Sequence, residues 1–173
     1  MKHFIDERNG FGALIAVFLI LVAMPTQSLA QSTPACGPLV LDLRADTAEY
    51  LDLGLEGPTQ HDQRNGRHTL LNEAGDKVGD LFFYSVFVMS EDGDGYSFYK
   101  SADFRLDGGS IYATGVYGHF DHTTKAIPIE GYVIAVIGGT GKYRGARGEL
   151  VTEPRPNKIL RHTFEIECLG PSG

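Results

Sequence analysis

The fold of this chain is decided by residues 134–150, IAVIGGTGKYRGARGEL, in which an apolar run enters a glycine cluster and a glycine-spaced run leaves it. We predict a strand, a tight turn and a second strand. Gly138, Gly139 and Gly141 are expected to supply the positive φ angles of the turn. Gly145 and Gly148 are expected where the second strand bends or where another backbone approaches closely. The stretch therefore indicates one corner of a closed, strongly curved sheet.

The same glycines could belong to a phosphate-binding loop, but their spacing argues against it. The Walker pattern needs a glycine where Val136 stands, and a serine or threonine where Tyr143 stands. The dinucleotide-binding fingerprint fails as well, because no amphipathic helix follows the glycines. We interpret the stretch as a structural turn.

The glycine-rich turn also carries a family resemblance. Residues 138–148, GGTGKYRGARG, resemble the signature of plant dirigent proteins and, more loosely, the matching hairpin of allene oxide cyclases. Residues 70–79, LLNEAGDKVG, are similar to a turn of the same superfamily. The resemblance implies a small antiparallel barrel that acts on a small molecule and is commonly a trimer.

The order of strand and turn signals along the chain agrees with such a barrel. Alternating or β-branched runs predict strands at residues 39–44, 67–72, 78–89, 96–106, 110–117, 129–137, 144–152 and 158–168. Short turns join most of them, so we expect an all-β fold: a closed, eight-stranded, antiparallel up-and-down barrel of the allene oxide cyclase type. The interior of a barrel of this size is filled by side chains or holds one small ligand.

The N-terminal region indicates export. Basic residues precede an apolar run from Phe11 to Met24, and the small side chains of Ser28 and Ala30 suit signal peptidase. We predict a cleavable signal peptide at residues 1–30 and a single barrel domain at 31–173, with a secreted or periplasmic location. The run is short for a membrane span, and no later run is long enough for one. A retained N-terminal anchor is the alternative.

Charge and composition restrict the expected partners. The net charge is −7 and no basic stripe is visible, which argues against nucleic acid and anionic membranes as partners. We expect a small hydrophobic molecule as ligand and a homo-oligomer, a trimer by resemblance. A lipocalin is the competing architecture, but the chain has no tryptophan and therefore no Gly-x-Trp start.

Cys36 and Cys168 are the two cysteines, and they stand near opposite ends of the predicted domain. An even count in an exported protein favours a disulfide, which would tie the first strand to the last. In the chain-entropy description, closing so long a loop contributes roughly 4 to 5 kcal/mol. Two free thiols or a catalytic cysteine are the alternatives.

No cofactor or metal is expected. Residues 119–122, HFDH, lack a third ligand nearby and are interpreted as a polar loop. Residues 91–95, EDGDG, lack the glutamate that a calcium loop places further along, and Asp-Gly repeats are common in hairpins.

Asp42 is a candidate catalytic residue on the first strand, where it stands between Leu41 and Leu43. If the leucines pack outward against a neighbour, Asp42 points into the barrel, where burial would raise its pKa and suit it to proton transfer. The resemblance implies an acidic residue facing the pocket at this place. The alternative is a solvated surface aspartate.

Tyr117 is the second candidate. It ends a Gly-Val-Tyr sequence that resembles the Gly-Pro-Tyr of allene oxide cyclases, whose tyrosine lines the cavity. A tyrosine there can donate a hydrogen bond to a ligand oxygen while its ring packs on apolar atoms. An ordinary packing aromatic is the alternative.

Arg147 is the third candidate. Strand alternation places Arg144 and Arg147 on opposite faces. By resemblance to dirigent proteins, whose cavity arginine helps to hold a quinone-methide-like intermediate, we choose Arg147. A salt bridge with Glu149 is the alternative role.

The last strand predicts ligand-binding residues. One of its faces carries Leu160, His162, Phe164, Ile166 and Cys168. Among apolar neighbours the pKa of His162 would fall, which favours a neutral imidazole that can act as a base. We assign His162, Phe164 and, on the long aromatic strand, Phe83 to ligand binding. A hydrogen-bonded core histidine is the alternative.

The implied activity is cyclisation, isomerisation or stereoselective coupling of a reactive small molecule without a cofactor, achieved by holding one conformer and excluding water. Whether the chain is an enzyme is left open by the sequence. A non-catalytic carrier of a lipid-like ligand is the alternative, and it predicts an almost wholly apolar pocket with Asp42 and Arg147 outside. A third possibility is a structural role with a filled barrel.

Overall fold

The structure, a computed structural model, describes residues 36, 38–90, 95–121 and 131–168. The predicted signal peptide, residues 91–94 of the predicted hairpin tip and residues 122–127 of the predicted loop at 118–127 lie outside the described residues. The start of that loop is wrong, because a strand continues to Asp121. The described residues belong to one compact unit, within Ser32–Gly173.

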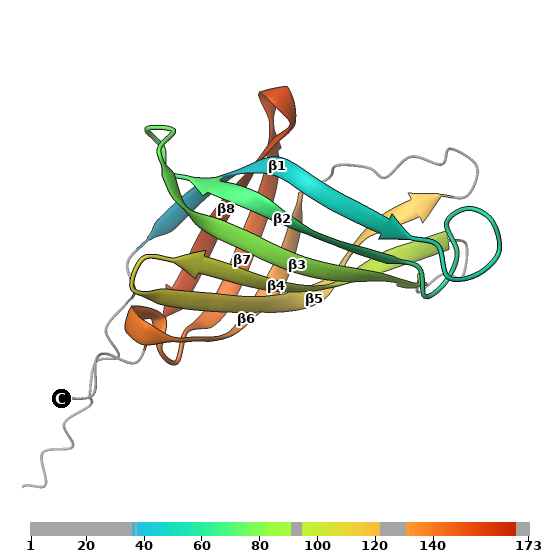
Figure 1. Ribbon diagram of the computed structural model, residues 1–173. Helices are drawn as coiled ribbons and strands as arrows, with labels where there is room; N and C mark the ends of the chain where they lie inside the picture. Colours follow the sequence, from blue (N-terminus) through green and yellow to red (C-terminus); the bar gives the residue numbers. More distant parts are fainter. Residues whose placement is uncertain (1–35, 37, 91–94, 122–130, 169–173) are drawn as a thin grey trace, which may run out of the picture. The chain divides into compact units, whose positions relative to one another are not determined.

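Eight antiparallel strands close into a barrel, and each strand pairs with its neighbours in the sequence (Figure 1). They are β1 (Leu39–Leu51), β2 (Gln63–Leu71), β3 (Lys77–Met89), β4 (Gly95–Leu106), β5 (Gly109–Asp121), β6 (Tyr132–Gly139), β7 (Arg147–Arg155) and β8 (Ile159–Glu167). The predicted fold class is confirmed. Within the described part of the chain, helical structure is limited to two 3₁₀ turns, η1 (Gly141–Tyr143) and η2 (Pro156–Lys158). No described helix combines the length and apolarity needed to cross a bilayer.

The seam between β1 and β8 closes the barrel. Its antiparallel ladder runs from the pair Leu39 and Phe164 to the pair Leu43 and Leu160. Beside the seam, a disulfide joins Cys36 to Cys168 across 132 residues of sequence, with the two Cα atoms 5.3 Å apart. This linkage agrees with the predicted pairing and ties the two ends of the domain together.

Strand alternation directs mainly apolar side chains into the barrel interior. The buried interior residues include Leu41, Leu43, Leu70, Leu81, Phe104, Ile111, Ile134, Val136, Leu150, Phe164 and Ile166. The predicted inward face of the last strand is the buried face of β8. Each fully buried large side chain contributes about 1.5 to 3 kcal/mol relative to its exposed state, so these residues dominate the stability of the barrel.

The glycine-rich stretch forms a longer connection than predicted, because η1 intervenes and β7 begins only at Arg147. The positive φ angles lie at Gly141, Gly145 and Gly148. The prediction of positive φ angles at Gly138 and Gly139 is wrong. Gly139 is instead required by space, since a Cβ there would collide with the carbonyl oxygen of Tyr143. The predicted close backbone approach is found at Gly148, where a Cβ would collide with a carbonyl oxygen of β8.

Strands β1 and β2 extend beyond their predicted ends. The ladder pairs Ala48 with Gly66 and Leu51 with Gln63, in a region where most side chains are exposed. Backbone hydrogen bonds support this extension without burying one face, so the sequence shows no alternation of polar and apolar residues there. The connection from β1 to β2 therefore begins after Leu51, at the end of this extended ladder.

The connection from β1 to β2 is organised around Asp62, whose side chain is completely buried. Its carboxylate accepts hydrogen bonds from the Tyr50 hydroxyl at 2.6 Å, from the Leu53 amide at 2.8 Å and from the Thr59 amide at 2.6 Å. Burial alone would raise the pKa of Asp62, but these hydrogen bonds outweigh it and the pKa is lowered.

We expect the stability supplied by Asp62 to be lost in acid. Because its pKa in the folded state lies below the unfolded value of about 3.9, the contribution is present above that pH and disappears as pH falls through the folded pKa. Melting temperatures of the wild type and Asp62→Asn, measured between pH 6 and pH 2, should differ at pH 6 and converge in acid. A difference that stays constant over this range would contradict this role.

Candidate functional site

A buried lysine lies inside the apolar barrel. Lys100 of β4 shares its face with Phe98, Ala102 and Phe104, and it is only 6% exposed. Its Nζ donates a hydrogen bond to the Tyr132 hydroxyl at 2.9 Å. Among the described side chains, no carboxylate forms an ion pair with it.

Three aromatic rings surround the Lys100 ammonium. Its Nζ lies 5.5 Å from the ring centroid of Phe83, 5.7 Å from that of Tyr117 and 5.4 Å from that of Tyr132. The two tyrosine rings stack with their centroids 4.2 Å apart, and the Tyr117 ring also stacks on that of Phe98 with a centroid distance of 5.5 Å. The ring faces attract the cation and hold it within an aromatic group that spans β3, β4, β5 and β6.

The ammonium remains charged at neutral pH. Burial is the largest influence on the pKa of Lys100 and would lower it, but Tyr132, Tyr117 and the hydrogen bond to Tyr132 outweigh burial, and the net shift is upward. Burial also raises the pKa of Tyr117, an effect that Lys100 partly offsets. The interior therefore combines a fixed positive charge with the hydroxyl groups of two tyrosines.

His162 of β8 is a buried, neutral histidine in the same interior. A hydrogen bond of 2.8 Å joins its Nδ1 to the Thr152 hydroxyl, and its Nε2 has no partner among the described residues. The rings of His162 and Phe104 are perpendicular, and their centroids are 5.5 Å apart. Burial, followed by the charge of Lys100, holds the pKa of His162 well below its usual value. A neutral imidazole with a vacant ring nitrogen can accept or donate a proton.

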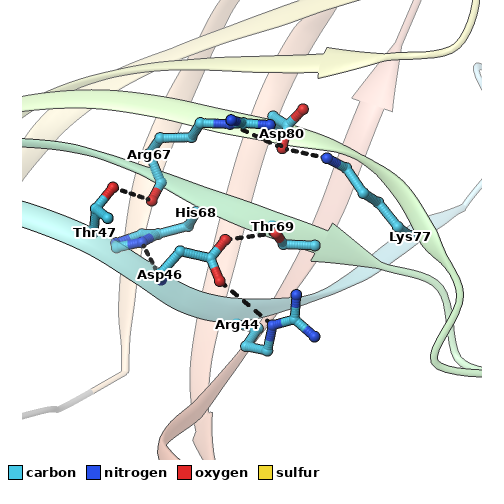
Figure 2. A network of polar contacts seen from close by, with 8 residues as sticks. All are labelled: Arg44, Asp46, Thr47, Arg67, His68, Thr69, Lys77 and Asp80. Atoms are coloured by element: carbon cyan, nitrogen blue, oxygen red, sulfur yellow. Dashed lines mark hydrogen bonds and ion pairs between the residues drawn. The ribbon is translucent and has the colours of Figure 1, made fainter.

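His68 of β2 lies opposite the irregularity at Asp46 in β1, and Figure 2 shows the contact between these two residues. The backbone N–H of Asp46 donates to its Nδ1 at 3.2 Å, and the Asp46 carboxylate is held by Thr69 and Arg44. The imidazole proton of neutral His68 therefore resides on Nε2. The ring stacks on Phe83 at 4.9 Å, and burial, followed by Lys100, lowers its pKa.

Ser85 completes this set of interior polar residues. It pairs with Lys100 across the ladder between β3 and β4, so both side chains face the interior. The Ser85 hydroxyl is buried and lies close enough to the Tyr117 hydroxyl to lower the pKa of Tyr117, although the two do not form a hydrogen bond of full geometry. We use the name interior polar cluster for Lys100, Tyr117, Tyr132, His68, His162 and Ser85.

Four of the predicted site residues lie at this cluster or pack close to it. Tyr117 and His162 belong to it, and Phe83 packs against the Lys100 ammonium. Phe164 is buried and contacts Phe104 edge-on at 4.9 Å. The structure therefore brings together residues from β3, β5 and β8 that the sequence analysis selected separately.

Asp42 lies on the outer face, because its neighbours Leu41 and Leu43 fill the interior. The expected inward orientation is wrong. Its carboxylate accepts two hydrogen bonds from Arg161, at 2.8 and 3.0 Å. The hydrogen bond to Arg161 holds the pKa of Asp42 below its usual value, which is the opposite of the predicted shift.

Arg147 is exposed at the start of β7 and does not join the interior polar cluster. Its guanidinium donates to the Ala146 carbonyl oxygen at 2.7 Å. A catalytic role for Arg147 or Asp42 stays a prediction, and it would have to act from outside the barrel.

The sequence analysis missed Lys100, Tyr132, His68 and Ser85. A signal for Lys100 exists in the alternation of β4, where Phe98, Ala102 and Phe104 share its face. A lysine on a strand's apolar face is unusual, because charged side chains are seldom buried without a partner. His68 carries a weaker signal, which is its alternation with the buried Leu70 on β2.

Comparison with known proteins supports the fold. No family model matches the sequence, and neither does any curated protein. A solved structure titled pyocyanin demethylase is similar with 22% identity over 75% of this chain and 98% of that chain, at a TM-score of 0.62. The Diels-Alderase AbmU from Streptomyces koyangensis matches with 17% identity over 79% of this chain and 70% of that chain, at a TM-score of 0.59.

A dirigent protein is also among the similar structures. The pterocarpan synthase dirigent protein PsPTS1 matches with 11% identity over 79% of this chain and 96% of that chain, at a TM-score of 0.55. At such low identity the likeness concerns the backbone arrangement alone. This chain therefore has the barrel fold that is found in dirigent proteins and in the Diels-Alderase barrels.

Proposed function

We propose that this protein binds a small hydrophobic molecule inside the barrel and guides its cyclisation, isomerisation or stereoselective coupling without a cofactor. The observation that carries the proposal is the interior polar cluster: a charged lysine, half-buried phenols and a neutral histidine within an apolar core. The titles of the structurally similar proteins name a Diels-Alderase and a pterocarpan synthase, which is in keeping with this class of reaction.

The cluster has the groups that such a reaction needs. The Lys100 ammonium and the Tyr117 hydroxyl can stabilise negative charge that develops on a ligand oxygen, because their positions are fixed and the surroundings are apolar. The vacant Nε2 of His162 can take up or deliver a proton. The stacked rings would hold the apolar body of the ligand in one orientation.

The carrier hypothesis is the competing proposal, and one of its two expectations agrees with the structure. Asp42 and Arg147 lie outside the interior, as a carrier would have them. However, the interior is not wholly apolar, which departs from the other expectation of a carrier. Lys100 would serve an acidic cargo as well as a substrate, so His162 is the group that favours chemistry over simple transport.

Export and assembly remain parts of the proposal. The Cys36–Cys168 disulfide supports a secreted or periplasmic location, since such bonds persist in oxidising compartments. A trimer is proposed by resemblance, and exposed apolar side chains such as Tyr112, Val116, Val133 and Ile137 on β5 and β6 offer a surface for it. Gel filtration with light scattering would give the number of subunits.

The proposed function predicts a large loss of turnover in His162→Gln. The protein would be incubated with a panel of apolar dienes, enones and quinone-methide precursors, and products would be separated on a chiral column. If His162 transfers a proton, the substitution should lower turnover by about 100-fold or more. Tyr117→Phe should lower turnover while keeping the ring stack. Tyr84→Phe, on the outer face of β3, should leave turnover unchanged.

Two results would decide against catalysis. If panel members bind to the protein but react no faster than they do in solution, the result would favour the carrier. Turnover that survives both interior substitutions would remove the interior polar cluster from the mechanism.

A further inference from the structure

We propose that the ligand of the barrel interior carries a carboxylate, and that this carboxylate pairs with the Lys100 ammonium. The inference rests on the proposed function and deepens it: the substrate class becomes an apolar acid. The observation that leads to it is a buried cation that has no anionic partner among the described side chains.

A buried charge without a counter-ion is costly, and proteins pair such charges or use them. The described ion pairs of this chain, such as that between Arg161 and Asp42, involve side chains with solvent access outside the interior. Among the described residues, the Lys100 ammonium contacts the Tyr132 hydroxyl and the faces of aromatic rings. These contacts compensate part of its lost hydration and leave its positive charge uncancelled.

The groups around Lys100 suit a carboxylate because they can donate hydrogen bonds. The proton of neutral His68 is on Nε2, since Nδ1 accepts from a backbone amide. Ser85 stands opposite Lys100 in the ladder, and its buried hydroxyl approaches that of Tyr117 without a hydrogen bond of full geometry. The Tyr117 hydroxyl is a further donor. A carboxylate has two oxygens and can accept from Lys100 and from these neutral donors together.

The electrostatics of the interior also favour an anion. Arg64 of β2 adds a second positive charge that acts on Lys100, His68 and Tyr117. The chain as a whole has a net charge of −7, so its interior differs in sign from its total charge. A carboxylic acid is ionised at neutral pH, whereas a phenol with a pKa near 10 would have to lose its proton on binding. The carboxylate is therefore the better match.

The test compares two probes of the same shape, 2-naphthoate and 2-naphthamide, by isothermal titration calorimetry; the amide is uncharged and has an NH2 donor in place of one carboxylate oxygen. The wild type should bind 2-naphthoate at least about tenfold more tightly, as expected for a charge-assisted hydrogen bond in an apolar site. Lys100→Met should abolish this preference and retain binding of 2-naphthamide. The matched control Lys77→Met, which changes an exposed lysine on β3, should keep the preference.

A second measurement uses no ligand. The double variant Lys100→Met, Tyr132→Phe removes a buried charge and its hydroxyl partner together. If the charge is retained for a ligand, its removal should raise the melting temperature by about 3 °C or more. A lower melting temperature would mean that the ammonium stabilises the fold, and would overturn the inference.

The outcomes separate this inference from the proposed function. Equal binding of the two probes by the wild type would contradict the carboxylate and leave ligand binding in the barrel intact. Failure of both probes to bind would count against interior binding itself, and the stability of the double variant would then decide whether Lys100 is a structural cation.

Discussion

Replacing both Cys36 and Cys168 with serine is expected to lower the free energy of unfolding by about 4 kcal/mol. The disulfide closes a loop of 132 residues, so it restricts nearly the whole unfolded chain of the domain. It also fastens the seam between β1 and β8, whose ladder is shorter than that between β3 and β4. At about 2 to 4 °C per kcal/mol, the melting temperature should fall by roughly 10 °C.

Urea titration of the wild type and the double serine variant would measure this change. Cys36→Ser alone should have a similar effect, because either substitution opens the loop. An unfolding free energy that remains within about 1 kcal/mol of the wild-type value would show that the ladder closes the barrel without help from the disulfide.

Phe104→Ala is expected to lower the free energy of unfolding by about 3 to 5 kcal/mol. The Phe104 side chain is completely buried. The centroid of its ring lies 4.9 Å from that of Phe164 and 5.5 Å from that of His162. Truncation would leave a void beside the histidine, and the surrounding strands cannot fill it because their registers are fixed on both sides. Turnover should fall as well, since the His162 ring loses a neighbour that positions it.

The matched control is Phe82→Ala on the outer face of β3. The guanidinium groups of Arg67 and Arg105 lie over its ring, and Cζ of Arg105 is 4.2 Å from the ring centroid. We expect a loss of about 1 kcal/mol or less for this substitution, measured by the same urea titration. Similar losses at both positions would contradict the assignment of inner and outer faces.

The barrel was predictable because its signals are local. Hairpin turns follow alternating strands, and in β8 the alternation places His162, Phe164 and Ile166 on one face, which is the buried face in the structure. The ends of β1 and β2 were not predictable, because backbone pairing extends these strands where both faces are exposed. The length of the connection before Arg147 also depends on η1, which no periodic pattern indicates.

The site was less predictable than the fold, for two physical reasons. The direction of Asp42 depends on which face of β1 is inside, and the inward face is the one that buries Leu41 and Leu43. The interior polar cluster is assembled from β2, β3, β4, β5, β6 and β8, so its members are far apart in the sequence. Only the closed barrel shows that Lys100 and His162 share one interior.

The central claim is that the barrel interior binds its ligand at Lys100. The most direct test follows the ε-methylene resonances of ¹³C-labelled lysines during a titration with 2-naphthoate, with Lys100 assigned by its absence from the spectrum of Lys100→Arg. We predict that the Lys100 resonance shifts in proportion to binding, while those of the exposed Lys77 and Lys142 stay in place. Saturation with 2-naphthoate that leaves the Lys100 resonance unmoved would contradict the claim.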